Sequence, residues 1–268
     1  MTNHKLDNLV LSFFGFSRLP FSKNISSKEI FSTQTYKEAF TRLEFGISDE
    51  DIMLLTGPVG SGKSVVLASL IHSLDLNSYI PIYIRGNNLK EGELYKAILI
   101  GLDQEPPRYA QTAKRLFYRL VPELTKKPVV IVDDAQEIHD PALTGIKSMV
   151  NFHFDSQNKI SFILSGQPEL KAKLKYSQFS ALKQRIRVFF HMESMSLEES
   201  CGYIDHHTKI AGRPNAIFSD EAKSDIHRKA EGIPRRVNAI CYRSILNAAL
   251  NELNIIDSSN LVLEDPTD

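Results

Sequence analysis

The chain has 268 residues, of which 42% are hydrophobic, which is enough for one large domain or one domain with a small appendage. Its 32 Lys and Arg residues balance 32 Asp and Glu residues, so a globally basic nucleic-acid binder is not favoured, although local patches are allowed. No apolar stretch approaches the roughly 18 residues of a membrane span, and the N-terminus has no signal-peptide core. From these two absences we expect a soluble, cytoplasmic protein. Cys201 and Cys241 lack metal-ligand spacing, so we expect them to be free thiols.

Residues 11–31 are rich in phenylalanine, and the Leu19-Pro-Phe21 element prevents a helix there. These aromatic side chains either clamp onto the domain or, in the case of Phe21, form a wall of a nucleotide base pocket. We expect residues 1–11 to be flexible and a helix to cover residues 35–46.

A phosphate-binding loop follows. The apolar run 52–55 predicts a strand and the pattern over 65–74 predicts a helix, while the sequence between them fits G-x-x-x-x-G-K-[ST]. Backbone N–H groups of such a turn point at phosphate oxygens, and the helix N-terminus adds partial positive charge. We expect Lys63 to reach the β- and γ-phosphates and Ser64 to ligate Mg2+. The residues expected to bind ATP are Gly57, Pro58, Val59, Gly60, Ser61, Gly62, Lys63, Ser64 and Val65.

Strands then alternate with helices, which predicts an α/β fold with a parallel sheet covered on both faces. Asp133 directly follows an apolar strand, so its carboxylate can hold the magnesium water shell beside Ser64. We expect Asp134 to polarise the attacking water; the alternative is an ordinary polar loop start. The predicted strands cover residues 80–84, 128–132 and 160–164, and the predicted helices cover 91–102, 111–124 and 140–154.

Ser165-Gly-Gln167 follows the last of these strands, where a polar side chain can touch the γ-phosphate or orient water. We favour Gln167 over Ser165, with an ordinary turn as the alternative. A basic run without acids then extends from Glu169 to Glu193. It is a solvated face, the source of an arginine finger at Arg185 that reaches a neighbouring subunit's ATP, or a patch for a DNA backbone. From charge alone, the DNA candidates are Lys90, Lys114, Arg115, Arg119, Lys171, Lys173 and Lys175.

The C-terminal part is helical. A capping box at Ser196–Glu199 predicts a helix that stops at Gly212, and further helices are expected from 219 to 232 and from 234 to 253. We therefore predict a nucleotide-binding core over residues 12–193, a helical lid over 194–256 and an acidic tail over 257–268. Arg235 is either surface charge or a lid arginine that contacts the γ-phosphate.

Several motifs occur together in one order: the phosphate loop, Asp133-Asp-Ala-Gln136, Gly166-Gln-Pro-Glu-Leu170, Leu182-Lys-Gln-Arg-Ile186 and Gly232-Ile-Pro-Arg235. With the opening Phe14-Gly-Phe-x-x-x-Pro-Phe21, this set resembles the ExeA-like branch of the AAA+ ATPases over about residues 11–255.

The resemblance implies an AAA+ αβα sandwich with a small helical lid, which assembles as a hexameric or heptameric ring or a helical filament. It implies Walker A roles for Lys63 and Ser64 and the Walker B role for Asp133. It also places Gln167 near sensor 1, Arg185 in the finger region and Arg235 at sensor 2.

One departure concerns the residue after Asp133. The branch usually has Asp-Glu-Ala-Gln, whereas this chain has Asp134 in place of Glu. The shorter side chain leaves its carboxylate roughly 1.5 Å, about one C–C bond, short of its usual reach to the water. A misplacement on that scale can cost on the order of a hundredfold in rate. We therefore predict intact ATP binding with slow hydrolysis to ADP and phosphate, which suits a timed switch better than a motor.

The branch includes membrane-spanning ATPases of type II secretion assembly and short, soluble partners of DDE transposases similar to TniB, IstB and TnsC. Because no membrane span is predicted, we expect the second kind. Such a regulator assembles on double-stranded DNA without reading its sequence and recruits or activates a DDE transposase. The alternatives are an ExeA/GspA-like secretion ATPase and an NTPase switch that acts on a protein partner without DNA.

Overall fold

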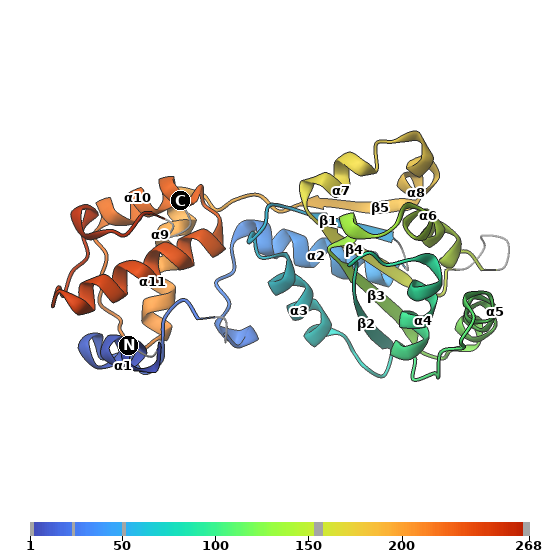
Figure 1. The fold of residues 1–268 in the computed structure, drawn as a ribbon, viewed down its shortest axis with the longest axis horizontal. Coiled ribbons are helices and arrows are strands. Elements are labelled where there is room, and N and C mark those ends of the chain that lie inside the picture. The colour runs from blue at the N-terminus through green and yellow to red at the C-terminus, as the bar shows by residue number, and fades with distance from the viewer. Residues whose placement is uncertain (1–2, 23–24, 50–51, 153–157, 265–268) are drawn as a thin grey trace. The chain divides into compact units, whose positions relative to one another are not determined.

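The computed structural model of the chain describes residues 3–22, 25–49, 52–152 and 158–264 (Figure 1). Its internal contacts divide the chain into two compact units. The helical unit contains residues 1–35, 59–62 and 193–268, and the sheet unit contains residues 36–58 and 63–192. Each unit has a hydrophobic core of its own.

The sheet unit is built on five parallel strands in the order β2-β3-β4-β1-β5. The four strands predicted from apolar runs are confirmed, whereas β5 was missed. The apolar residues of β5 are interrupted by Arg187, so they give no continuous apolar run. The strands are β1 (Ile52–Thr56), β2 (Tyr79–Arg85), β3 (Lys127–Asp133), β4 (Ser161–Gly166) and β5 (Ile186–His191).

Seven α-helices lie wholly or mainly in the described part of the sheet unit. Two of them, α7 and α8, have six residues each, too few for a helical period to be visible in the sequence. The predicted helix over 140–154 ends at Met149, and residue 154 lies outside the described residues. The helices are α2 (Gln34–Ser48), α3 (Lys63–Ser73), α4 (Glu91–Gly101), α5 (Ala110–Leu120), α6 (Asp140–Met149), α7 (Pro168–Lys173) and α8 (Ser180–Arg185).

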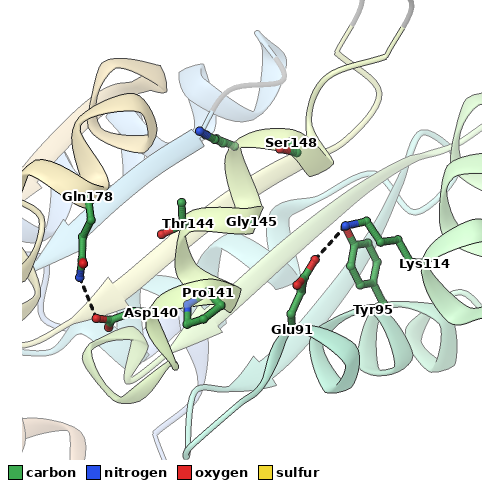
Figure 2. A pocket seen from close by; sticks show the side chains of 10 residues that line it. Glu91, Tyr95, Lys114, Asp140, Pro141, Thr144, Gly145, Ser148 and Gln178 are labelled. Carbon is green, nitrogen blue, oxygen red and sulfur yellow. Dashed lines mark hydrogen bonds and ion pairs between the residues drawn. The ribbon is translucent and has the colours of Figure 1, made fainter. Parts of the chain in front are cut away.

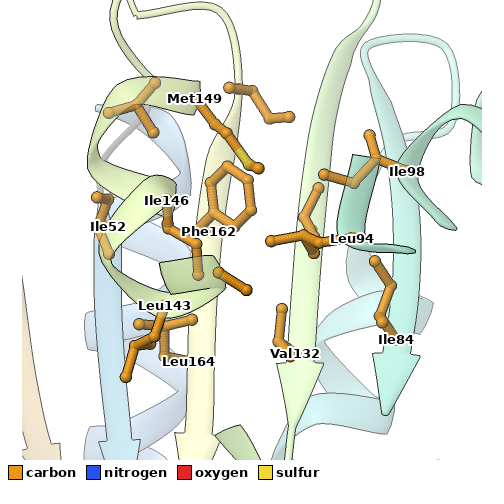
Figure 3. Close-up of a cluster of buried hydrophobic side chains, with 14 of the residues drawn as sticks. Ile52, Ile84, Leu94, Ile98, Val132, Leu143, Ile146, Met149, Phe162 and Leu164 are labelled. Atoms are coloured by element: carbon orange, nitrogen blue, oxygen red, sulfur yellow. The ribbon is translucent and has the colours of Figure 1, made fainter. Parts of the chain in front are cut away.

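Both faces of the sheet are buried, and neighbouring residues of a strand point to opposite faces. On one face, Leu164 and Phe162 of β4 pack with Ile146 of α6 (Figure 3). On the other face, Ile163 of β4 belongs to a cluster that includes Leu67 of α3. The predicted α/β fold with a parallel sheet and helices on both faces is therefore confirmed.

The helical unit consists of α1 (Asn3–Phe14), α9 (Leu197–Ile210), α10 (Asp220–Ala230) and α11 (Pro234–Leu250). The predicted capping box is present, since the Glu199 N–H donates to Ser196 Oγ and the Ser196 N–H donates to Glu199 Oε2, both at 3.1 Å. Short 3-10 turns complete the described part of the chain: η1 (Ser27–Glu29) and η5 (Ser258–Asn260) in this unit, and η2 (Val121–Glu123), η3 (Ala135–Glu137) and η4 (Ser177–Phe179) in the sheet unit.

The two ends of the chain differ from the predicted boundaries. Residues 3–14 are helical rather than flexible, because Val10 and Phe14 of α1 are buried in the core of the helical unit. The following segment to residue 35 groups with the helical unit and not with the nucleotide-binding core. Part of the expected tail also packs there, since the Val262 N–H donates to Ser244 Oγ at 3.0 Å.

The helical unit contains a buried histidine that makes its stability depend on pH. His207 is 2% exposed, and its ring stacks on Phe21 with centroids 5.0 Å apart. Burial, with smaller effects of His206 and Arg18, lowers the pKa of His207 from 6.5 to about 4. His207 therefore takes up a proton at a higher pH in the unfolded chain than in the folded chain. The free energy of unfolding has its full value above pH 6.5 and decreases as the pH falls toward 4.

We expect this group to lower the free energy of unfolding by on the order of 2 kcal/mol at about pH 5. His207→Phe keeps an aromatic ring beside Phe21 but removes the titration. Urea midpoints, followed by circular dichroism at neutral and mildly acidic pH, should therefore fall less in the variant than in the wild type. An equal fall in both proteins would contradict the assignment.

Candidate nucleotide-binding site

The phosphate loop connects β1 to α3. Gly60 and Gly62 have φ angles of 85° and 99°, a left-handed conformation that glycine adopts without steric cost. Lys63 is the first residue of α3 and is 9% exposed. Its ammonium group donates to the carbonyl oxygens of Gly57 at 2.7 Å and Pro58 at 2.8 Å. The loop thus holds a cation beside the positive end of a helix, an arrangement that favours an anion there.

Asp133 ends β3 and is the centre of a hydrogen-bond network at the carboxyl edge of the sheet. Its side chain is 8% exposed. Oδ1 accepts hydrogen bonds from Ser165 Oγ at 2.8 Å and from the Asp134 N–H at 3.1 Å. Oδ2 accepts one from the Tyr83 hydroxyl at 2.8 Å and a long one from Ser64 Oγ at 3.5 Å. The structure therefore brings the two predicted metal ligands, Ser64 and Asp133, together.

Asp134 lies in a second, connected network. Its φ angle of 52° is left-handed, a conformation that asparagine and aspartate adopt more readily than other non-glycine residues. Gln136 Nε2 donates to Asp134 Oδ1 at 3.1 Å, and the Gln136 amide oxygen accepts the Gln167 N–H at 3.1 Å. Gln136 thus joins the turn after β3 to the turn after β4.

The predicted role of Gln167 beside the γ-phosphate stays a prediction, and the structure adds a contact of Ser165 that we did not predict. Ser165 contacts the Asp133 carboxylate directly, whereas Gln167 enters the network through its backbone N–H. Ser165 is the penultimate residue of β4 and is fully buried, and it lies on the same face as Asp133 because the two strands are paired in register. The sequence argument also missed Tyr83 and Gln136. Tyr83 could have been found by extending the alternation of β2 to the same sheet edge.

The remaining predicted residues lie on separate elements. Arg185 is the half-buried last residue of α8 in the sheet unit. Arg235 is exposed in the first turn of α11 in the helical unit, where its backbone N–H donates to the Gly60 carbonyl oxygen at 3.3 Å. Phe21 is 8% exposed and packs on His207, as the clamp alternative for the N-terminal aromatic residues expects.

The polar groups of the phosphate loop and of Asp133 fit a nucleotide phosphate with a bound Mg2+. Ser61 Oγ in the loop is buried and has no hydrogen-bond partner among the described residues. A phosphate oxygen would supply that partner, alongside the loop N–H groups and the Lys63 ammonium. The Ser64 hydroxyl and the Asp133 carboxylate offer oxygen atoms, which are the ligands that Mg2+ prefers.

A groove of about 440 Å3 lies elsewhere in the sheet unit, among α4, α5 and α6 (Figure 2). Within it, Lys114 pairs with Glu91 at 2.9 Å, and Gln178 donates to Asp140 Oδ2 at 2.8 Å. None of the residues that we assign to the nucleotide lines it. The groove is therefore separate from the phosphate loop.

Among the described residues, no helix is both long enough and apolar enough to cross a membrane.

Residues 47–174 match the AAA domain family. The chain is also similar to general secretion pathway protein A of Aeromonas hydrophila, with 31% identity over 244 residues. The similar region covers 88% of this chain but 44% of that protein, so the chain spans less than half of its relative's length.

Solved structures resemble the chain at low sequence identity. Cdc6p from Pyrobaculum aerophilum has a TM-score of 0.71 at 17% identity and covers 88% of this chain and 67% of its own. The RuvB Holliday junction branch migration motor of Thermotoga maritima has a TM-score of 0.59 at 19% identity. The match covers 90% of this chain and 70% of the RuvB chain. At these identities the likeness concerns the fold alone. Together with the sheet and the phosphate loop, it shows that this chain has the AAA+ P-loop NTPase fold.

Proposed function

We propose that the chain is an ATP-binding and ATP-hydrolysing AAA+ module of the ExeA/GspA type, which serves a step of general secretion. The observation that carries the ATPase proposal is the contact between Ser64 Oγ and the Asp133 carboxylate at the carboxyl edge of the sheet. Ser64 directly follows the buried Lys63 in the sequence. The similarity to general secretion pathway protein A supports the secretion alternative over the transposition role that we predicted from the sequence.

In this proposal, the loop N–H groups and Lys63 bind the phosphates, and Ser64 and Asp133 hold Mg2+. The ion would neutralise charge on the phosphate oxygens. The Asp134 carboxylate accepts a hydrogen bond from the attacking water and orients it. Arg185 of one subunit completes the site of the next, and Arg235 couples the helical unit to the γ-phosphate.

Lys63→Ala should weaken ATP binding by about 10- to 100-fold, because it removes a charge-assisted hydrogen bond worth about 1.5–3 kcal/mol. Calorimetric titration with ATP and Mg2+ measures the change. Lys37→Ala is the matched control, since Lys37 is an exposed lysine of α2 in the same unit. An unchanged affinity in the Lys63 variant would overturn the nucleotide site.

Asp134→Glu should raise the rate of ATP hydrolysis, by up to about a hundredfold, because the longer side chain restores the water position of the related ATPases. Asp134→Asn should lower the rate further, while neither variant changes ATP affinity much. Steady-state phosphate release provides the measurement, with thermal melting as a control for the cost of Glu at a left-handed position. A Glu variant no faster than the wild type would contradict the predicted effect of the shorter Asp134 side chain.

Normal ATP hydrolysis by Arg185→Ala would contradict the predicted role of Arg185 as an arginine finger.

The transposition regulator remains the second candidate function, and exposed basic side chains favour it. The Lys171, Lys175 and Lys183 side chains are exposed on or beside α7 and α8. This candidate requires assembly on double-stranded DNA and a DDE transposase as partner.

Binding to labelled duplex DNA, measured with ATP, ADP or no nucleotide over a salt series, separates the two functions. A DNA-binding regulator should bind in the ATP state only and lose affinity steeply with salt, since each phosphate contact releases a counterion. For the secretion ATPase we expect no ATP-dependent binding at moderate salt. ATP-dependent assembly on DNA would reverse the order of the two proposals.

A further inference from the structure

We propose that Tyr83 is a positioning residue for Asp133, which sets the orientation of the carboxylate that binds the metal. This inference rests on the magnesium site of the proposed function. It adds a residue on β2, a strand that contributes none of the predicted ligands.

Tyr83 and Ser165 each donate a hydrogen bond to a different oxygen of the Asp133 carboxylate. The Tyr83 hydroxyl donates to Oδ2 and Ser165 Oγ donates to Oδ1, each at 2.8 Å. Rotation of the carboxylate plane would break both hydrogen bonds, so the pair fixes its orientation. Oδ2, the oxygen that Tyr83 contacts, is also the one that faces Ser64.

The backbone holds Tyr83 in place for this contact. Arg85 of β2 is in register with Asp133, and the Gly86 N–H donates to the Asp133 carbonyl oxygen at 2.7 Å. A Cβ on Gly86 would lie 2.4 Å from the Asp134 carbonyl oxygen, so only glycine allows this close approach. The end of β2 is therefore fixed to the same two residues whose side chains form the site.

The Tyr83 side chain points to the face of the sheet that carries Asp133. Its neighbours Ile82 and Ile84 are buried in the core on the opposite face, and strand residues alternate between faces. The ring is 48% exposed, so it contributes little to the core and its hydroxyl is the group with a specific partner.

The test is Tyr83→Phe, which removes the hydroxyl and keeps the ring. Binding of a fluorescent ATP analogue is measured in EDTA and over a Mg2+ titration. Because outer-shell partners of a metal ligand typically contribute about 10- to 100-fold in metal affinity, we expect the Mg2+ midpoint to rise at least tenfold. Nucleotide affinity in EDTA should stay unchanged, a separation that general loss of structure would not produce.

Tyr79→Phe is the matched control, because Tyr79 lies on the same strand and packs on the same face. Ser165→Ala should shift the Mg2+ midpoint in the same direction as Tyr83→Phe. A wild-type midpoint in Tyr83→Phe, with a clear Mg2+ effect in the wild type, would overturn the role of Tyr83 alone. A wild type whose nucleotide binding ignores Mg2+ would overturn the metal site of the proposed function, and this inference with it.

Discussion

The site is organised around one buried carboxylate. A charged group that is 8% exposed requires hydrogen bonds or a counter-charge, since an unpartnered buried charge is strongly destabilising. Asp133 obtains its donors from four separate segments: β2, the start of α3, the end of β4 and its own turn. Satisfying this one group therefore fixes the relative positions of the strand ends on which the phosphate site depends.

The turn after Asp133 shows how a local backbone conformation can select a residue. Asp134 has a left-handed φ of 52°, which the short side chain of aspartate tolerates better than that of glutamate. Its carboxylate also accepts a hydrogen bond from Gln136, whose amide oxygen accepts one from the next turn. Aspartate at this position, where the resemblance leads us to expect glutamate, is thus compatible with the backbone.

Sequence reasoning was strongest where burial produces a visible pattern. Strands buried on both faces read as apolar runs, and the phosphate loop and the Ser196 cap depend on residue types at fixed spacings. It failed at α1, where Leu6, Leu9, Val10, Phe13 and Phe14 follow the helical period although we predicted a flexible end. It also failed at β5, whose apolar residues are interrupted by Arg187. The contact of Ser165 with Asp133 could not be read from the sequence, because it depends on the register between β3 and β4.

The basic side chains also show why a count of charges overstates a binding surface. Lys173, one of the DNA candidates, pairs with Asp140 at 2.9 Å and donates to the Ile138 carbonyl oxygen at 2.8 Å. Lys114, another candidate, pairs with Glu91. Each of these lysines is attracted to an internal acid, which reduces the charge that it can offer to a phosphate backbone. Non-specific DNA binding depends on the number of phosphates that are neutralised, so these ion pairs weaken the case for DNA.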